Sequence, residues 1–370
     1  MSIKIYQSEE EIIKKLSDRN LIFKKSKLQN ALKNYSYFNL FNGIENILLE
    51  SNKPKYFDNI CLDDFINIYN FDKDLSLNIL KIIYSIEEKL KTSISNHISE
   101  SYCSSLENTM QYTNKTNFMN PKDSDPSSKT YCRYSNNYPF MSNQYKKYYD
   151  DFENFILFQP YYLTNLINQN DFIDISFYTD NSYMAPNNVA VYRDFNKVVH
   201  KNIAVPIWIA ILTLSFGQII RLTHYLKDEV MIKVMNDFEM KLSKRNQFLN
   251  MLDFMLLLRN SCAHNRLIYR FETNKNTYIN SLLIKTFDLK PKNKSRNKSS
   301  IISLYDSLKI LSFFADISEL IPIFENILLT NEKSMGKEKA STVNNNILSQ
   351  IGCNDYNSLI STLNGKKYNF

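Results

Sequence analysis

Glycine and proline are scarce in this chain: its 370 residues include 5 glycines and 9 prolines. An antiparallel sheet with many tight turns is therefore not expected, because such turns depend on these two residues. Leu, Ile, Lys, Asn and Glu recur at helical spacing instead, and 44% of the residues are hydrophobic, which is enough for a sizeable core. The sequence predicts an all-α globular protein.

The 5 cysteines are odd in number and far apart, and none forms a C-x-x-C pair. This pattern predicts neither a disulfide framework nor a zinc knuckle. The sequence also lacks the P-loop, dinucleotide-binding, nucleophile-elbow and H-E-x-x-H motifs, and its carboxylates form no evident metal cluster. We therefore expect no metal and no cofactor.

Long apolar runs are also rare. The first ten residues contain no signal core, and the one stretch of membrane length, residues 203–220, includes Pro206, Gly217 and Gln218. A buried helix is favoured there over a membrane span, so we expect no membrane partner and a cytoplasmic protein. The net charge of +7 permits a polyanionic partner without requiring one.

Apolar periodicity predicts helices over residues 8–32, 63–101, 150–168, 200–227, 243–271, 301–329 and 347–363, with a break at Pro322. Aromatic residues around Tyr37 lead to an Asn-Gly pair at Gly43, which either ends a helix or makes a turn.

The expected organisation is a single helical unit with the following segments. These are N-terminal helices over 1–60, a core formed by 61–103 and 195–285, a polar insertion or loop over 104–145, a basic linker over 286–300 and C-terminal helices over 301–370. Residues 290–298 are rich in lysine, and a solvated linker is favoured there over a phosphate contact.

In residues 256–267 an apolar helical segment is followed by a cation, an amide and a titratable base that lie close together in the sequence. These are Arg259, Asn260 and His264. On a continuous helix Asn260 and His264 share a face, and Arg259 is rotated by roughly 140° from His264. Arg266 and Arg270 then lie within about 20° of the Arg259 direction and form an arginine stripe.

These residue types suit metal-free RNA cleavage by attack of the 2′-hydroxyl on the adjacent phosphate. His264 would act as the base or acid, Arg259 would stabilise the phosphorane, and Asn260 would orient the imidazole or bind phosphate. One chain offers a single histidine here, so a twofold dimer would supply the missing acid. A thiol nucleophile is disfavoured, because Cys262 and His264 point about 160° apart on a helix.

The segment from Arg259 to Leu267 resembles the R-x4-6-H motif of the HEPN ribonuclease superfamily and the signature of Abi-like (AbiD/AbiF type) abortive-infection proteins. Two further stretches are similar to motifs of that family: residues 205–217, with Trp208, and residues 71–92, with Glu87. The chain departs from the family pattern at Ser76 and Lys91, where the family often has Arg, and in the insertion.

The resemblance implies a HEPN-like helical bundle, a homodimer that brings two motifs together, and antiphage defence by RNA cleavage. It implies catalytic roles for Arg259, Asn260 and His264, RNA binding by Arg266 and Arg270 and support from other motif positions. The supporting residues are Glu87 and Trp208. It also allows regulation by a bound small non-coding RNA.

Two alternatives remain open at this point. The same basic helix could bind RNA as part of a ribonucleoprotein without cleaving it. Arg259 and His264 could also be structural residues of a helical bundle, since a polar group in such a setting is often hydrogen-bonded internally.

Overall fold

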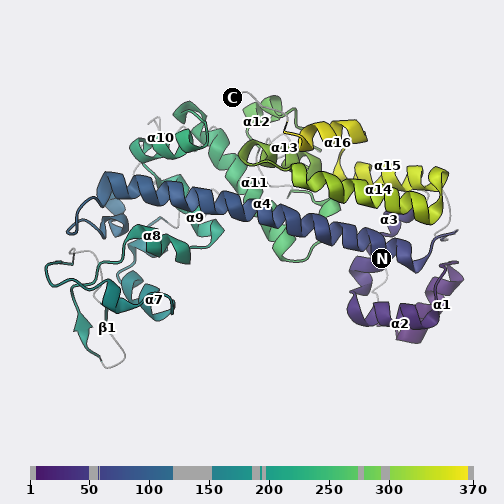
Figure 1. The fold of residues 1–370 in the computed structure, drawn as a ribbon, viewed down its shortest axis with the longest axis horizontal. Coiled ribbons are helices and arrows are strands. Elements are labelled where there is room, and N and C mark those ends of the chain that lie inside the picture. The colour runs from purple at the N-terminus through teal and green to yellow at the C-terminus, as the bar shows by residue number, and fades with distance from the viewer. Residues whose placement is uncertain are drawn as a thin grey trace. The chain divides into compact units, whose positions relative to one another are not determined.

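The computed structural model describes residues 6–49, 57, 59–119, 152–185, 192–193, 197–273, 279–292 and 301–365. These residues are predominantly helical, with a single two-stranded sheet among them, so the predicted all-α class is confirmed (Figure 1). Most of the predicted insertion (residues 120–145) and the C-terminal half of the predicted linker (residues 293–300) lie outside the described residues.

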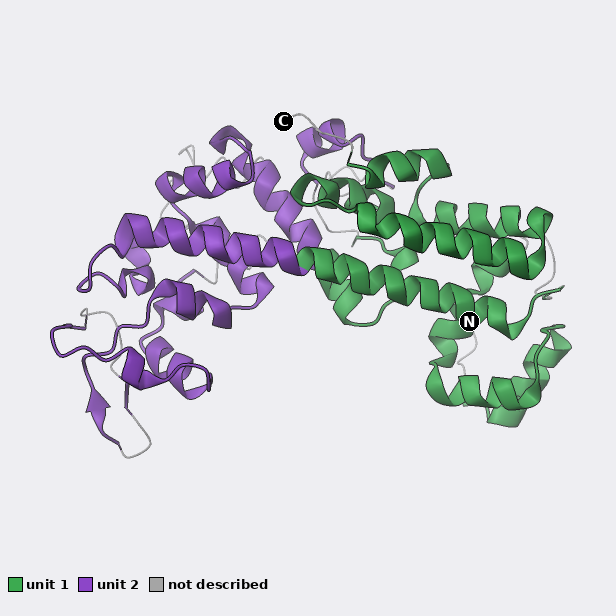
Figure 2. Cartoon of the chain, viewed as in Figure 1, with its two compact units in different colours: residues 1–83, 257–273, 302–368 green, residues 84–256, 274–301, 369–370 purple. Residues whose placement is uncertain are grey.

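The chain divides into two compact units, shown in green and purple in Figure 2. Unit 1 comprises Met1–Ile83, Leu257–Thr273 and Ile302–Tyr368, and unit 2 comprises Tyr84–Leu256, Asn274–Ile301 and the last two residues. Two helices contribute to both units: α4 (Leu62–Tyr102) and α11 (Arg245–Ala263). The predicted core segments 61–103 and 195–285 are thus divided between the units.

Unit 1 is formed by helices from both ends of the chain. Besides its parts of α4 and α11, it contains α1 (Glu9–Asp18), α2 (Lys25–Asn34), the π-helical turn η1 (Phe38–Asn42), α3 (Glu45–Leu48), the 3-10 turns η9 (Ile268–Arg270) and η10 (Ser318–Leu320), α13 (Leu304–Phe314), α14 (Ile321–Met335), α15 (Lys337–Ile351) and α16 (Tyr356–Leu363). Helix α15 packs against α14, α3 and η9, and α13 packs against α16 and η9.

The N-terminal half of α4 contributes an apolar stripe to the core of unit 1. Leu75 and Ile79 on its apolar stripe are fully buried, and Asp64 in its first turn accepts a hydrogen bond from the Cys61 amide at 2.8 Å. An acidic cap and an i, i+4 stripe are what a long, half-buried helix requires. The helix predicted over residues 63–101 is confirmed by α4.

Unit 2 contains the rest of α4 and of α11 together with shorter elements. These are the 3-10 turns η2 (Gln111–Thr113), η3 (Lys115–Asn117), η5 (Ile156–Phe158), η6 (Ile175–Phe177), η7 (Ile211–Thr213) and η8 (Leu242–Lys244), the helices α7 (Tyr162–Asn168), α8 (Ile207–Ala210), α9 (Phe216–Tyr225), α10 (Asp228–Asp237) and α12 (Ser281–Thr286), and the antiparallel strands β1 (Tyr192–Arg193) and β2 (Val199–His200). The sheet pairs Tyr192 with His200.

Two predicted helices in the N-terminal and central parts of the chain are interrupted by local backbone signals. The helix predicted over residues 8–32 is two helices, because the chain turns at Asn20, which has a positive φ of 62°. The helix predicted over 200–227 begins as strand β2 and reforms as α8 and α9. Pro206 precedes α8, and Ser215 starts α9 with a capping box.

The C-terminal half also contains more helices than periodicity indicates. Pro322 lies in the first turn of α14, where proline is tolerated, and the break precedes it at the extended Ala315. The predicted tail helix is the end of α15 and all of α16, separated at Gly352, which has a φ of 91°.

Of the helix predicted over 150–168, only α7 is a regular α-helix within the described residues.

No helix within the described residues has the length and apolar character needed to cross a membrane.

Candidate active site

The candidate site lies in unit 1, at the C-terminal end of α11. The helix ends at Ala263, and Asn265 adopts the left-handed conformation with a φ of 55°. The Arg266 amide donates to the Ser261 carbonyl at 3.2 Å, and the Asn265 amide donates to the Cys262 carbonyl at 3.2 Å. This pair of hydrogen bonds is a Schellman motif, which reverses the chain immediately after His264.

The predicted helix over residues 243–271 is therefore wrong at its C-terminal end. Because Arg266 follows the reversal and Arg270 lies in the separate turn η9, the arginine stripe drawn on a continuous helix does not exist. Arg266 is exposed, whereas Arg270 is half-buried and its guanidinium donates to the Gly43 carbonyl at 3.5 Å.

The three predicted catalytic residues lie within six consecutive residues at the C-terminal end of α11, and His264 is the first residue after the helix. The Nη1 group of Arg259 donates to Oδ1 of Asn260 at 3.3 Å, and both side chains are half-buried. The backbone amide of His264 donates to the Asn260 carbonyl at 3.0 Å, and its imidazole is exposed. The site thus combines a partly shielded cation and amide with a histidine that solvent and a ligand can reach.

Three side chains on one face of α4 contact the turn that follows His264. The buried carboxylate of Asp72 accepts a hydrogen bond from the Tyr269 amide at 2.8 Å. The ammonium group of Lys73 lies 3.5 Å from the Asn265 carbonyl and 3.5 Å from the Asp72 carboxylate. Tyr69 hydrogen-bonds to the side chain of Asn265. The turn is therefore held at both ends.

The environment of Asp72 changes its acidity. Burial raises the pKa of Asp72 to about 6, although the backbone amides of Tyr269 and Ile268 and the charge of Lys73 act in the opposite direction. Desolvation dominates because the side chain is 0% exposed. Asp72 therefore changes from its protonated to its ionised form as the pH rises through about 6.

Gly43 forms a second support for the same turn. The Tyr269 hydroxyl donates to the Gly43 carbonyl, and a Cβ atom at position 43 would clash with Leu267 and with the Asn39 carbonyl. The backbone of Gly43 is right-handed with a φ of −69°, so the close approach, and not a special conformation, requires glycine here. The Asn-Gly pair does end a helix, as one of the two predicted readings has it.

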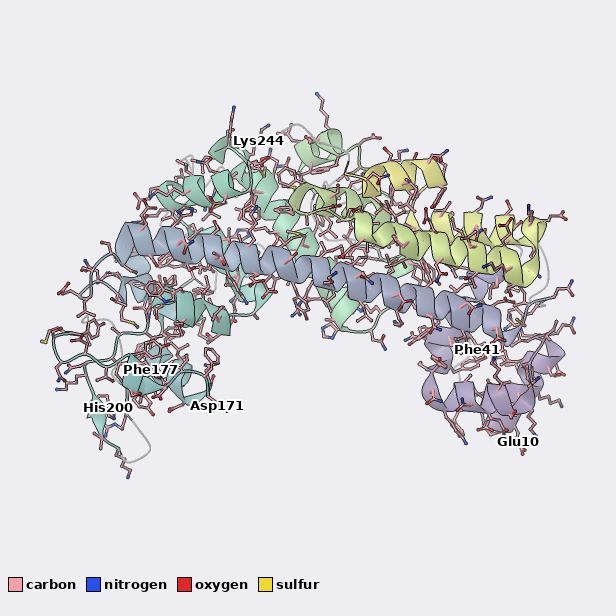
Figure 3. All side chains as sticks on the ribbon, in the orientation of Figure 1. Glu10, Phe41, Asp171, Phe177, His200 and Lys244 are labelled. Atoms are coloured by element: carbon pink, nitrogen blue, oxygen red, sulfur yellow. The ribbon has the colours of Figure 1, made fainter. Side chains whose placement is uncertain are left out.

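The buried ring of Phe41, labelled in Figure 3, belongs to the same turn η1 and packs against Phe65 of α4 with ring centroids 5.1 Å apart. The aromatic residues before Gly43 therefore fix η1 to the helix that also supplies Asp72. The sequence alone did not connect these residues to the candidate site.

Cys262 is not equipped to act as a nucleophile. Its thiol is buried, and burial raises the pKa of the Cys262 thiol to about 11. A thiol with such a pKa is almost entirely protonated at neutral pH, and the thiolate is the nucleophilic form.

The two predicted supporting residues, Glu87 and Trp208, lie in unit 2. Glu87 is 8% exposed and forms an ion pair with Lys91 at 2.8 Å, one turn further along α4. Trp208 in α8 is 53% exposed. Glu87 thus has a local partner, and the support of both residues for the site stays a prediction.

The described part of the basic linker also lies in unit 2. Lys292 is exposed, and its backbone pairs with that of Ile301 in an antiparallel bridge. Within the described ranges no three His, Cys, Asp or Glu side chains are grouped as they are around a metal ion.

Comparison with known proteins gives one match. The family model described as "Abi-like protein" matches residues 30–270, which include η1, the whole of α4 and the candidate site. No curated protein and no solved structure matches the chain. Because the model covers more than half of the sequence, the chain belongs to the Abi-like protein family.

Proposed function

We propose that this protein is a metal-independent HEPN endoribonuclease of the AbiD/AbiF type that acts in bacterial antiphage defence in the cytoplasm. Membership of the Abi-like family supports a role in abortive infection. The observation that carries the reaction is the grouping of a half-buried Arg259, its hydrogen-bonded partner Asn260 and the exposed His264 at one helix end.

In the proposed reaction the 2′-hydroxyl of RNA attacks the adjacent phosphorus. His264 removes the hydroxyl proton or protonates the leaving 5′-oxygen, and Arg259 stabilises the negative charge of the phosphorane. Asn260 holds the Arg259 guanidinium, and the exposed Arg266 binds an RNA phosphate. The products are a 2′,3′-cyclic phosphate and a 5′-hydroxyl.

The exposed His264 also supports the proposed homodimer. One histidine cannot be the base and the acid in the same step, so a second copy of the motif supplies the other function across a twofold axis. Wild-type protein mixed and re-equilibrated with an equal amount of His264→Ala protein tests this arrangement. If both imidazoles are required, an equal mixture retains roughly a quarter of the activity of the same total protein, whereas independent sites retain roughly half.

A cleavage assay tests the function directly. Protein freed of nucleic acid and kept in EDTA should cleave RNA. Arg259→Ala should lower kcat by roughly 10²- to 10³-fold, because a charge-stabilising group is lost. His200→Ala is the matched control, since His200 lies in β2 of unit 2. Equal cleavage by wild-type and Arg259→Ala protein would overturn the proposal.

One observation keeps a second function in consideration. Within the described residues the His264 side chain forms no hydrogen bond that would orient its imidazole, as a general base usually requires. A non-cleaving RNA-binding protein that forms a ribonucleoprotein, for instance with a small non-coding RNA, needs no such orientation. Intact RNA that copurifies with the protein and dissociates steeply with salt would favour this second function.

A further inference from the structure

The contacts between α4 and the turn after His264 come from a short run of one helix face. Tyr69, Asp72 and Lys73 are spaced i, i+3, i+4, so their side chains emerge on the same side of α4. Asp72 accepts from the Tyr269 amide, Lys73 donates to the Asn265 carbonyl, and Tyr69 hydrogen-bonds to the Asn265 side chain. All these residues belong to unit 1.

We propose that Asp72 is a positioning residue for the Arg259–His264 site. Its carboxylate fixes the Tyr269 amide, and with Lys73 it holds the turn that carries His264 and Arg266 in one position. This inference rests on the proposed nuclease function. It assigns Asp72 no contact with RNA, since the side chain is 0% exposed.

Stability alone does not explain a carboxylate at this place. Its neighbours Phe71 and Leu75 are buried hydrophobic residues, and a buried acid is costly compared with an apolar side chain of similar volume. The α4 helix does not need Asp72 as a cap, because Asp64 performs that task in its first turn. What Asp72 adds is a directed hydrogen bond to a residue 197 positions further along the chain.

The ionisable groups around Asp72 come from both elements that pack against it. Lys73 and Tyr69 belong to α4, and Cys262 and Tyr269 belong to the end of α11 and to η9. Lys73 is the one cation that forms an ion pair with Asp72 within the described residues. The carboxylate and the ammonium group thus act as a pair on the two ends of the turn.

Variants of two buried acids on the same helix test the proposal. Asp72→Ala removes the acceptor of the Tyr269 amide, whereas Asp72→Asn keeps an oxygen acceptor in the same place. Asp64→Ala is the matched control, because Asp64 is also buried and also accepts a backbone amide, from Cys61. Lys73→Met is a second test variant: it removes the contact with Asn265 and keeps most of the packing of a half-buried side chain.

Two measurements are made on each folded variant: single-turnover RNA cleavage, and amide hydrogen exchange of residues 264–270 in protein without RNA. Asp72→Ala should lower the cleavage rate by about 100-fold with little change in RNA affinity, because small displacements of a reacting group are costly. Lys73→Met should lower the rate by about 10-fold, and Asp72→Asn and Asp64→Ala by no more than about threefold. The Tyr269 amide should exchange faster in Asp72→Ala and not in Asp64→Ala.

Equal cleavage rates for Asp72→Ala and Asp64→Ala would overturn the positioning role. An unchanged hydrogen-exchange rate of the Tyr269 amide in Asp72→Ala would also overturn it. If Asp72→Ala does not fold, a wild-type cleavage rate in Lys73→Met would overturn it instead. A wild-type protein that cleaves no RNA contradicts the proposed function instead, and the exchange measurement still shows whether Asp72 holds the turn.

Discussion

The helix α11 carries an arginine near each end, and each arginine has a histidine in its neighbourhood: His224 of α9 near Arg245, and His264 after the helix near Arg259. One cluster is buried and the other is partly exposed. Arg245 at the start of α11, in unit 2, is 1% exposed, and its guanidinium donates to Asp228 at 3.1 Å, to the His224 carbonyl at 3.1 Å and to the Leu226 carbonyl at 2.8 Å. Arg259 near the end of α11, in unit 1, donates to Asn260 alone among the hydrogen bonds of the described residues. The Arg245 guanidinium is thus held by three hydrogen bonds within unit 2, whereas the Arg259 guanidinium keeps further N–H donors that can bind a ligand.

The histidines differ in the same way. His224 is 1% exposed and lies 4.0 Å from the buried Asp253. Burial lowers the pKa of His224 well below its ordinary value and raises that of Asp253 well above its own, so both side chains are held neutral. His264 is exposed. Residue type therefore does not distinguish the buried structural cluster from the candidate active site, whereas exposure and remaining hydrogen-bonding capacity do.

Replacing each histidine by alanine should produce the largest difference between the two clusters in activity and stability. His264→Ala should lower RNA cleavage by roughly 10²- to 10⁴-fold, because the proton-transfer group is lost. Its stability should change by less than about 0.5 kcal/mol, since the side chain is exposed. His224→Ala should instead cost about 2–3 kcal/mol by leaving a cavity among buried groups. Urea unfolding and cleavage assays on both variants measure the contrast, and a strongly destabilised His264→Ala would break it.

The two arginines should show the next largest difference. Arg245→Ala removes one partner of a buried ionic network, which typically costs about 3–5 kcal/mol. Arg259→Ala should cost no more than about 2 kcal/mol, because its half-buried guanidinium makes one hydrogen bond, to the neutral amide of Asn260. Thermal unfolding of the two variants at one pH tests this order. A reversed order would mean that Arg259 is a structural residue.

Asp72 should make the stability of unit 1 depend on pH. Its pKa is raised to about 6 in the folded chain, so between about pH 4 and pH 6 the folded chain retains a proton that the unfolded chain has lost. The contribution of Asp72 to the free energy of unfolding is therefore full below pH 4 and is lost as the pH rises through 6, by about 3 kcal/mol in total. Urea unfolding of wild-type and Asp72→Asn protein at pH 4 to 7 isolates this change. A difference between them that does not vary with pH would contradict the assignment.

Gly43→Ala should have the smallest effect of the set. The added Cβ atom overlaps Leu267 and the Asn39 carbonyl, and overpacking of this kind costs about 1–3 kcal/mol. Gly336→Ala is the control for glycine loss in general, because a Cβ atom there meets no neighbour, although its φ of 80° adds some strain. Chemical denaturation of both variants shows whether the turn after His264 is packed against η1 as closely as described.

The sequence predicts the long helix α4 well, because its apolar stripe repeats for many turns and acidic residues lie in its first turn. It does not predict where α11 ends. Ala263 and His264 are compatible with helix, and Leu267 and Arg270 continue the periodicity by coincidence, so the single signal was the tolerance of Asn265 for a left-handed backbone.

The residues of the candidate site could be predicted from the sequence, whereas the residues that hold the turn after His264 could not. Arg259, Asn260 and His264 are neighbours along the chain, so helix geometry alone brings them together. Asp72 and Gly43 meet the turn only in the folded chain, at separations of 197 and 226 residues from Tyr269. A buried acid beside an apolar stripe indicates that a partner exists, but periodicity carries no information on which distant residue it is.

The ends of the RNA products test the central claim most directly. Wild-type protein in EDTA should generate fragments with a 2′,3′-cyclic phosphate and a 5′-hydroxyl, and His264→Ala protein should generate no such fragments above background. Fragments with a 3′-hydroxyl and a 5′-phosphate, or the same cyclic ends at the same rate without the imidazole of His264, would contradict the assignment of this site.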